Sequence, residues 1–347
     1  EFIRRIRENL IFDEPDERYG YQRQAEFMQL LKDNIIAQKE HYSIAFFAIA
    51  ETFLKHSNQM TKGGRNHSFS IYQYPIPATE HIKEIRTNLW ELLFSMINDY
   101  RSHVVTTIQK FKPDFKERNP ELLDFDLTLL IPFIKENFSP SSFKETFVVN
   151  SLISSLNREK EITNKSYLEL KPIFNTKEYQ DYRKLDWNRF RDKEEFEYDW
   201  HEYEKVKTAD LKENFMFNSE QEFCSFLNTI DNIQSVEQSN HSQIENSLEI
   251  ILPENFIQNN ELGLSLLEAY LKKNYDIRAL HKTISTIVNH SEASSLKLWK
   301  LLDSWYNKNC IYWKLNFLER LPNEYVNDGY YNRLIKTIES IESLTYL

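Results

Sequence analysis

The sequence predicts an all-α protein: an irregular, solenoid-like helical-repeat array of helical hairpins, with one short β excursion near residues 66–76. Three observations predict this fold class. Apolar residues recur at spacings of three and four through most of the 347-residue chain. Glycine is scarce, with 5 in the whole chain. This argues against an all-β or nucleotide-binding fold, because tight hairpins and nucleotide-binding loops need several glycines. Helix-length segments in the last third alternate with short breaks.

The first expected helices cover residues 24–38, 42–56 and 79–97. The segment 42–56 is apolar nearly all round, and we therefore expect it to be deeply buried. In the segment 79–97 the apolar stripe passes beside Trp90, which we expect to be buried. Thr79 stands where this helix begins and is the expected N-cap.

Two interruptions follow from local chemistry. The run "SFSIYQY" alternates like a strand, but one strand cannot form a sheet by itself, so we expect an extended excursion near residues 66–76. Pro132 lies inside the apolar pattern of residues 122–138 and is expected to kink or split that helix. A new helix should then run to residue 157, with Ser139 and Ser141 as possible caps.

The chain divides by composition into three predicted parts. Residues 1–157 form an N-terminal helical unit, residues 158–218 a charged, aromatic connector, and residues 219–347 a C-terminal helical-repeat array. In the last part, breaks recur at helix-plus-turn spacing, at Asn274, His290, Asn307 and Pro322. Two successive helices there match the size of known helical repeats. No letter-by-letter repeat is visible, so a plain irregular bundle stays open as the alternative.

The connector contains the stretch "KEEFEYDWHEYEK", residues 193–205. On a helix, Phe196, Trp200 and Tyr203 share one face and the acidic residues another. Adjacent acids on an exposed helix share one environment, whereas catalytic carboxylates need environments that separate their pKa values. We interpret the stretch as an amphipathic helix with a packed aromatic face. A carboxylate active site and a partner-binding surface are the two alternatives.

The net charge and the cysteine content limit which partners and which cellular compartment we expect. The net charge of -10 argues against a nucleic-acid partner. Two cysteines, Cys224 and Cys310, do not make a disulfide framework and fit a reducing compartment, so we expect a cytoplasmic location. No apolar run approaches the ~20 residues of a membrane span, so no membrane partner is expected. The first residues, "EFIRRIRENL", lack an initiating Met and have the pattern of the middle of a helix, so we expect a fragment of a longer chain.

Sequence motifs for catalysis are absent from the chain. It has no G-x-x-x-x-G-K-[ST], no H-E-x-x-H, no C-x-x-C and no G-x-S-x-G. Asp124 and Asp126 form an acidic pair, but without a third ligand they predict a helix-starting cluster rather than a metal site. We therefore predict no catalytic, cofactor-binding or metal-binding residue and no cofactor, and we expect that this segment is not an enzyme. The alternative is a helical nuclease or another enzyme whose site is assembled from scattered His, Asp and Arg.

The segments "FIRRIRENLIFDEPDERYGY" and "HIKEIRTNLWELLFSMI" resemble the region that follows the NTPase core in large bacterial STAND NTPases, the NLR-like proteins of antiphage defence. The resemblance covers about the first 110 residues and, through architecture, the C-terminal array. It implies that this chain is a sensor region that binds an invader protein, such as a phage protein, and that oligomers form through flanking domains. The chain departs from the family in lacking a P-loop, so no nucleotide-binding residue is carried over.

Aromatic residues in the C-terminal array exceed what one buried stripe needs. Adjacent residues on a helix point about 100° apart, so one member of each pair Trp305/Tyr306 and Tyr312/Trp313 should pack and the other reach the surface. Tyr, Trp and Arg are enriched at binding hot spots. We predict a protein-binding surface between residues 270 and 320, formed by Arg278, Trp299, Tyr306, Tyr312, Trp313 and Lys314. The alternative is an irregular core that wraps both aromatics of each pair.

Overall fold

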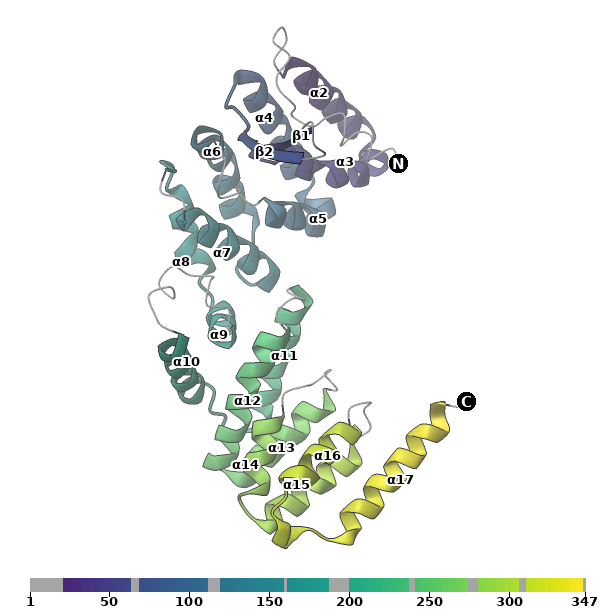
Figure 1. Cartoon of the computed structure of the whole chain (residues 1–347). Coiled ribbons are helices and arrows are strands. Elements are labelled where there is room, and N and C mark those ends of the chain that lie inside the picture. Colours follow the sequence, from purple (N-terminus) through teal and green to yellow (C-terminus); the bar gives the residue numbers. More distant parts are fainter. Residues whose placement is uncertain are drawn as a thin grey trace. The chain divides into compact units, whose positions relative to one another are not determined.

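The chain folds into helices that fall into two compact units, Glu1–Tyr179 and Gln180–Leu347. The computed structural model describes residues 21–63, 69–111, 119–158, 161–186, 200–236, 241–273, 280–305 and 310–345 (Figure 1). The all-α prediction is confirmed, because helices build both units and the two strands of the described residues form one small hairpin. The boundary between the units lies inside the range 158–218 that was predicted as a connector.

Unit 1, in the residues that the structure describes, consists of six long helices, a strand pair and two short helical turns. Its elements are α2 (Gln22–Ala37), α3 (Lys39–Phe53), β1 (Ser57–Gly63), β2 (Phe69–Pro75), α4 (Glu80–Ser95), α5 (Ile97–Lys110), α6 (Pro120–Asn137), α7 (Phe143–Asn157), η1 (Ser166–Leu170) and α8 (Lys171–Phe174). The long helices form two rows: α2, α4 and α6 contact one another in sequence, and so do α3, α5 and α7. This is the neighbour-on-neighbour packing of a helical array.

The strand pair shows what the sequence pattern missed. The predicted excursion contains β2, but β2 pairs antiparallel with β1, from Ser57 opposite Pro75 to Gly63 opposite Phe69. Residues 57–63, "SNQMTKG", are mostly polar and carry no strand signal of their own. The hairpin is joined to the helices at its base, where the backbone N–H of Ile76 donates to the carbonyl of His56 at 2.9 Å.

Helix starts and interruptions in unit 1 agree with the sequence expectations only in part. Thr79 occupies the N-cap position of α4, but its side chain accepts no capping hydrogen bond. The cap of α7 is Ser142 rather than Ser139 or Ser141, and its side chain accepts from the backbone N–H of Glu145. Pro132 does not split the helix, since α6 is continuous from Pro120 to Asn137.

The core of unit 1 is formed by the inward faces of both rows. Trp90 is fully buried, as predicted, and its ring stacks 5.7 Å from that of Phe94. The expectation that α3 would be deeply buried is wrong for one face. Phe46 and Phe53 are buried, but Ile44 is 67% exposed.

Unit 2 begins within α9 and is helical in all its described elements except connecting turns. Its elements are α9 (Lys177–Leu185), α10 (Trp200–Asn214), α11 (Glu220–Val236), α12 (His241–Gln258), α13 (Asn260–Lys272), α14 (His281–Val288), α15 (Glu292–Ser304), α16 (Cys310–Arg320), η4 (Asn323–Tyr325) and α17 (Asp328–Thr345). Contacts run along one row through α10, α12, α14 and α16, and along a second through α11, α13 and α15, while α17 packs on α16.

The part of the predicted connector that belongs to unit 2 is packed rather than free. Tyr182 and Leu185 at the end of α9 are buried. The Ser247 hydroxyl of α12 donates to the carbonyl of Leu185 at 2.6 Å. In α10, Tyr203 is buried and Glu202 exposed, which fits an aromatic face that packs. Phe196 lies outside the described residues.

One glycine of unit 2 is required by close packing. Gly263 of α13 faces α12, and a Cβ atom added to it would lie 2.3 Å from Cα of Phe256. No side chain fits at that distance, because the obstacle is backbone and cannot rotate away. Gly263 therefore sets how closely α12 and α13 approach.

Candidate functional site

Three clusters of polar residues are candidates for a functional site, and the first is buried in the core of unit 1. Asp126 of α6 accepts a hydrogen bond at 2.8 Å from Nε1 of Trp90. Its other oxygen, Oδ2, lies 3.2 Å from Nε2 of His56 and 3.8 Å from Nη1 of Arg86. Arg86 also donates to the carbonyl of Lys55. The cluster thus joins α4, α6 and the base of the β hairpin.

The charges of this cluster compensate one another. Burial alone raises the pKa of Asp126, but the Arg86 charge and the hydrogen bonds from His56 and Trp90 outweigh it, so the pKa is lowered. Burial lowers the pKa of Arg86, and Asp126 opposes that effect. All four side chains are buried, so a substrate cannot reach them. The cluster has the residue types of a catalytic site and the position of a structural one.

The acidic pair predicted as a helix-starting cluster is divided between two roles. Asp124 accepts from the backbone N–H groups of Thr163 at 3.1 Å and Asn164 at 3.0 Å, so it fixes the segment before η1. Asp126 lies in the middle of α6 and points into the core, so the helix-start interpretation is wrong for it. Within the residues that the structure describes, no three His, Cys, Asp or Glu side chains gather as a metal site.

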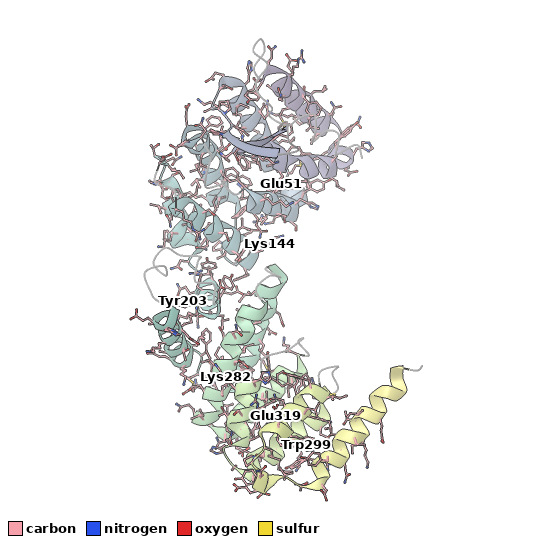
Figure 2. All side chains as sticks on the ribbon, viewed as in Figure 1. Glu51, Lys144, Tyr203, Lys282, Trp299 and Glu319 are labelled. Atoms are coloured by element: carbon pink, nitrogen blue, oxygen red, sulfur yellow. The ribbon has the colours of Figure 1, made fainter. Side chains whose placement is uncertain are left out.

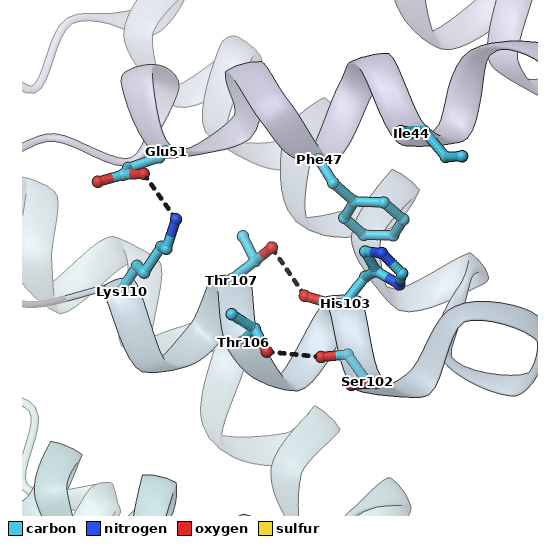
Figure 3. A pocket seen from close by; sticks show the side chains of 8 residues that line it. All are labelled: Ile44, Phe47, Glu51, Ser102, His103, Thr106, Thr107 and Lys110. Atoms are coloured by element: carbon cyan, nitrogen blue, oxygen red, sulfur yellow. Dashed lines mark hydrogen bonds and ion pairs between the residues drawn. The ribbon is translucent and has the colours of Figure 1, made fainter. Parts of the chain in front are cut away.

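The second cluster is an open groove of about 420 Å³ between α3 and α5, in the range of ligand pockets (Figure 3). Its α3 wall carries Ile44, Phe47 and Glu51, at helical spacings of three and four. The rings of Phe47 and His103 stack with centroids 5.1 Å apart. At the other end Lys110 binds Glu51 at 3.1 Å.

The α5 wall of this groove is tied to α7. Its lining residues are Ser102, His103, Thr106, Thr107 and Lys110. Lys144 of α7 donates to the hydroxyls of Thr106 at 3.1 Å and Ser102 at 3.4 Å. Next to Lys144, Glu145 is buried and binds Arg101 through two hydrogen bonds of 2.6 and 2.8 Å. These bonds raise the pKa of Arg101, although its partial burial opposes the effect.

The third cluster lies on the surface of unit 2, where α14 meets α16. The His281 ring contacts Tyr312 Oη through Nε2 at 3.0 Å, and through Nδ1 it contacts Asn316 Nδ2 at 2.9 Å and Arg320 Nη2 at 3.3 Å. Arg320 Nε donates to Asn316 Oδ1 at 3.0 Å. Tyr312 is 50% exposed, and Leu315, one helical turn further on, is 49% exposed. We call Tyr312, Leu315, His281 and Arg320 the α14–α16 patch.

The hydrogen-bond donors of the patch fix the state of His281. Nδ1 faces two donors, an amide N–H and a guanidinium N–H, so it must accept. The ring proton is then on Nε2, which donates to Tyr312 Oη. As a consequence, the hydroxyl proton of Tyr312 has no acceptor among the residues that the structure describes.

The structure places the predicted partner-binding residues in different environments. Tyr312 is exposed and Trp313 is buried, as the 100° argument predicts. Trp299 and Lys314 are also buried, with the ammonium of Lys314 over the Trp299 ring and bound to Asp303 at 2.8 Å. The prediction that Trp299, Trp313 and Lys314 form a surface is therefore corrected: Trp299 and Lys314 belong to the packing between α15, α16 and α17, and the Trp313 ring packs against His281 of α14. Arg278 and Tyr306 lie outside the described residues.

The residues Lys282, Trp299 and Glu319, labelled in Figure 2, mark α14, α15 and α16, which pack against one another in unit 2. Sequence reasoning missed His281 and Leu315 of the patch, and also Asn316, which contacts His281. The signal for Asn316 was available, because Tyr312, Asn316 and Arg320 follow at intervals of four on one helix. Nothing local indicated His281, which comes from another helix.

No protein-family model, curated protein or solved structure matched the chain in the comparisons with known proteins. A search of the described helices found none that is both long and apolar enough to cross a membrane.

Proposed function

We propose that this chain is a protein-binding helical array and that the α14–α16 patch contacts the partner. The observation that carries the proposal is the fixed Tyr312. Its ring is half exposed, yet its hydroxyl is held by His281, which Asn316 and Arg320 hold from the other side. A side chain fixed before binding loses less conformational entropy when a partner arrives.

The chemistry of the patch suits a protein surface. Tyr312 and Leu315 offer an aromatic ring and an aliphatic chain on one exposed face of α16. Arg320 is half-buried, and its hydrogen-bond partners among the described residues are the Asn316 amide and the His281 ring, with no carboxylate. Its remaining N–H groups can donate to a partner. Tyr and Arg are the residue types that supply most binding energy at interfaces.

The test compares variants of the full chain as bait in lysate of the cells that make it. Tyr312→Ala and Arg320→Gln should each lose the same bound protein, by about tenfold or more for a hot-spot residue. Tyr331→Ala is the matched control, since Tyr331 is a tyrosine of α17 with 46% exposure. Helicity is checked first by circular dichroism. Retention of every bound protein by Tyr312→Ala, or an equal loss with Tyr331→Ala, would contradict the proposal.

The larger assembly is part of the same proposal. A sensor region within a bigger defence or signalling ATPase fits a partner-binding helical array, with a phage protein as the partner and oligomers formed by flanking domains. Cys224 and Cys310 are both free, which fits a reducing compartment such as the cytoplasm. The parent reading frame tests the assembly: it should encode a P-loop upstream of Glu1, and a parent chain without any NTPase motif would refute this part.

A further inference from the structure

We propose that the groove between α3 and α5 in unit 1 is a second binding site, which takes a peptide segment with an apolar side chain next to an Asp or Glu carboxylate. The site is separate from the α14–α16 patch and does not depend on the function proposed for it. Its evidence is the set of hydrogen-bonding groups that the groove leaves unused, together with its charge and its exposed apolar wall.

The polar end of the groove offers donors. The Thr106 hydroxyl donates to the carbonyl of Ser102 at 2.8 Å and accepts from Lys144, so its proton is used. Thr107 donates to the carbonyl of His103 at 2.9 Å. The ammonium of Lys144 has three N–H groups and binds two hydroxyls, which leaves one. The Ser102 hydroxyl accepts from Lys144, and its own proton remains available.

Lys144, next to the groove, carries a positive charge that no described carboxylate compensates. Glu51 and Lys110 compensate each other across one end, and Arg101 and Glu145 compensate each other beside the other end. Lys144 is half-buried and binds hydroxyls, with no carboxylate partner among the described residues. The charged residues that line the groove are thus balanced, and Lys144, which reaches two of the lining hydroxyls from α7, adds one positive charge beside the groove in a chain whose net charge is -10. Unused donors beside an uncompensated cation favour a carboxylate.

The apolar wall explains why the ligand needs a hydrophobic group beside its carboxylate. Ile44 is 67% exposed on α3, and Phe47 is half-buried one turn further on, stacked on His103. Figure 3 shows the Phe47 and His103 rings side by side between the two helices. Glu51 and Lys144, labelled in Figure 2, mark α3 and α7 on either side of α5. A peptide side chain that covered Ile44 and the ring edges would remove apolar surface from water.

The test uses 3-phenylpropanoate as the probe, because it joins one ring to one carboxylate, and 3-phenylpropanamide as its neutral counterpart. Amide chemical shifts of the full chain are followed by NMR during titration. We expect shifts confined to residues 44–51 and 102–110, with a dissociation constant on the order of millimolar for so small a ligand. The amide should bind about fivefold more weakly, the size of one partly exposed charge interaction.

Two pairs of variants show which residue recognises the carboxylate of the probe and which contacts its apolar ring. Lys144→Gln keeps a donor for Ser102 and Thr106 but removes the charge, so it should abolish the preference for the acid over the amide. Lys171→Gln, at an exposed lysine of α8, is its control. Ile44→Ser should weaken the acid and the amide alike, whereas Leu30→Ser, at a 59% exposed leucine of α2, should change neither.

Three results would overturn the proposal. The first is the absence of shifts in the groove at millimolar probe. The second is equal affinity of the unmodified chain for the acid and the amide, a comparison that needs no variant to fold. The third is tighter binding of phenyl phosphate than of 3-phenylpropanoate, which would assign the groove to phosphate-bearing ligands instead. The Tyr312→Ala variant should bind the probe as the unmodified chain does, so the two sites are tested independently.

Discussion

Replacing Asp126 by Asn tests the buried cluster of unit 1. Asn keeps an oxygen that can accept from Trp90 Nε1, now 2.8 Å from Asp126 Oδ1, but it removes the negative charge. Arg86 and His56 then remain buried without their carboxylate. Breaking a buried ion pair by removing one partner costs about 3–5 kcal/mol. Because one hydrogen bond survives, we expect a loss near 3 kcal/mol, a large part of the roughly 5–15 kcal/mol that keeps a domain folded.

The assay is urea unfolding followed by circular dichroism, combined with hydrogen exchange of the amides of residues 80–95 to locate the loss in unit 1. Asp124→Asn is the matched control, since Asp124 lies two positions away and binds backbone N–H groups at the surface of the same helix. We expect it to cost about 1 kcal/mol, the net worth of such hydrogen bonds. If Asp126→Asn costs no more than Asp124→Asn, the cluster does not stabilise unit 1 as argued.

The same variant has a pH signature. The pKa of Asp126 is lowered in the folded chain, so its carboxylate stabilises the fold fully above the ordinary Asp value of about 3.9. That contribution is lost as the pH falls below this value and through the lowered folded pKa. The difference in unfolding free energy between the unmodified chain and Asp126→Asn should therefore shrink as the pH falls below about 4. A difference that grows over that range would contradict the assigned direction.

Two further predictions concern packing. Trp90→Ala should cost roughly 3 kcal/mol or more in urea unfolding, because a fully buried aromatic of unit 1 is removed; a change under about 0.5 kcal/mol would show that Trp90 is not in the core. Gly263→Ala should lower the unfolding free energy by about 1–3 kcal/mol, because the new Cβ meets the backbone of Phe256. Gly329→Ala is its control, since a Cβ there meets the movable side chain of Asn327 and should leave stability unchanged or raise it by about 1 kcal/mol; equal effects of the two substitutions would refute the close-packing argument.

Helical periodicity was sufficient to predict what depends on local pattern. It placed the helices of both units and the burial of Trp90, and it predicted that Tyr312 and Trp313 would face different ways. It failed where contacts come from distant segments. The partner of β2 is a polar strand without its own signal, and Asp126 depends on His56 and Arg86, which lie on other elements.

The functional surfaces were predicted less well than the fold, for a related reason. An aromatic residue on a helix predicts either core or surface, and the choice is made by the helices that pack around it. Trp299 of α15 is buried because α16 and α17 cover it, and Lys314 of α16 because α15 and α17 do. No spacing within α15 or α16 reveals this. Ile44 shows the reverse case, since it belongs to an apolar helix but lies on the side of α3 that faces the groove.

Photocrosslinking in the cells that make this chain tests the central claim, binding of a protein through the α14–α16 patch, most directly. A photoreactive phenylalanine replaces Leu315 on α16 or, as the control, Leu296 on α15, which is similarly exposed. We expect one discrete adduct from position 315, lost when Arg320→Gln is added, and none of that mass from position 296. No adduct at 315, the same adduct at both positions, or an adduct indifferent to Arg320 would contradict the claim.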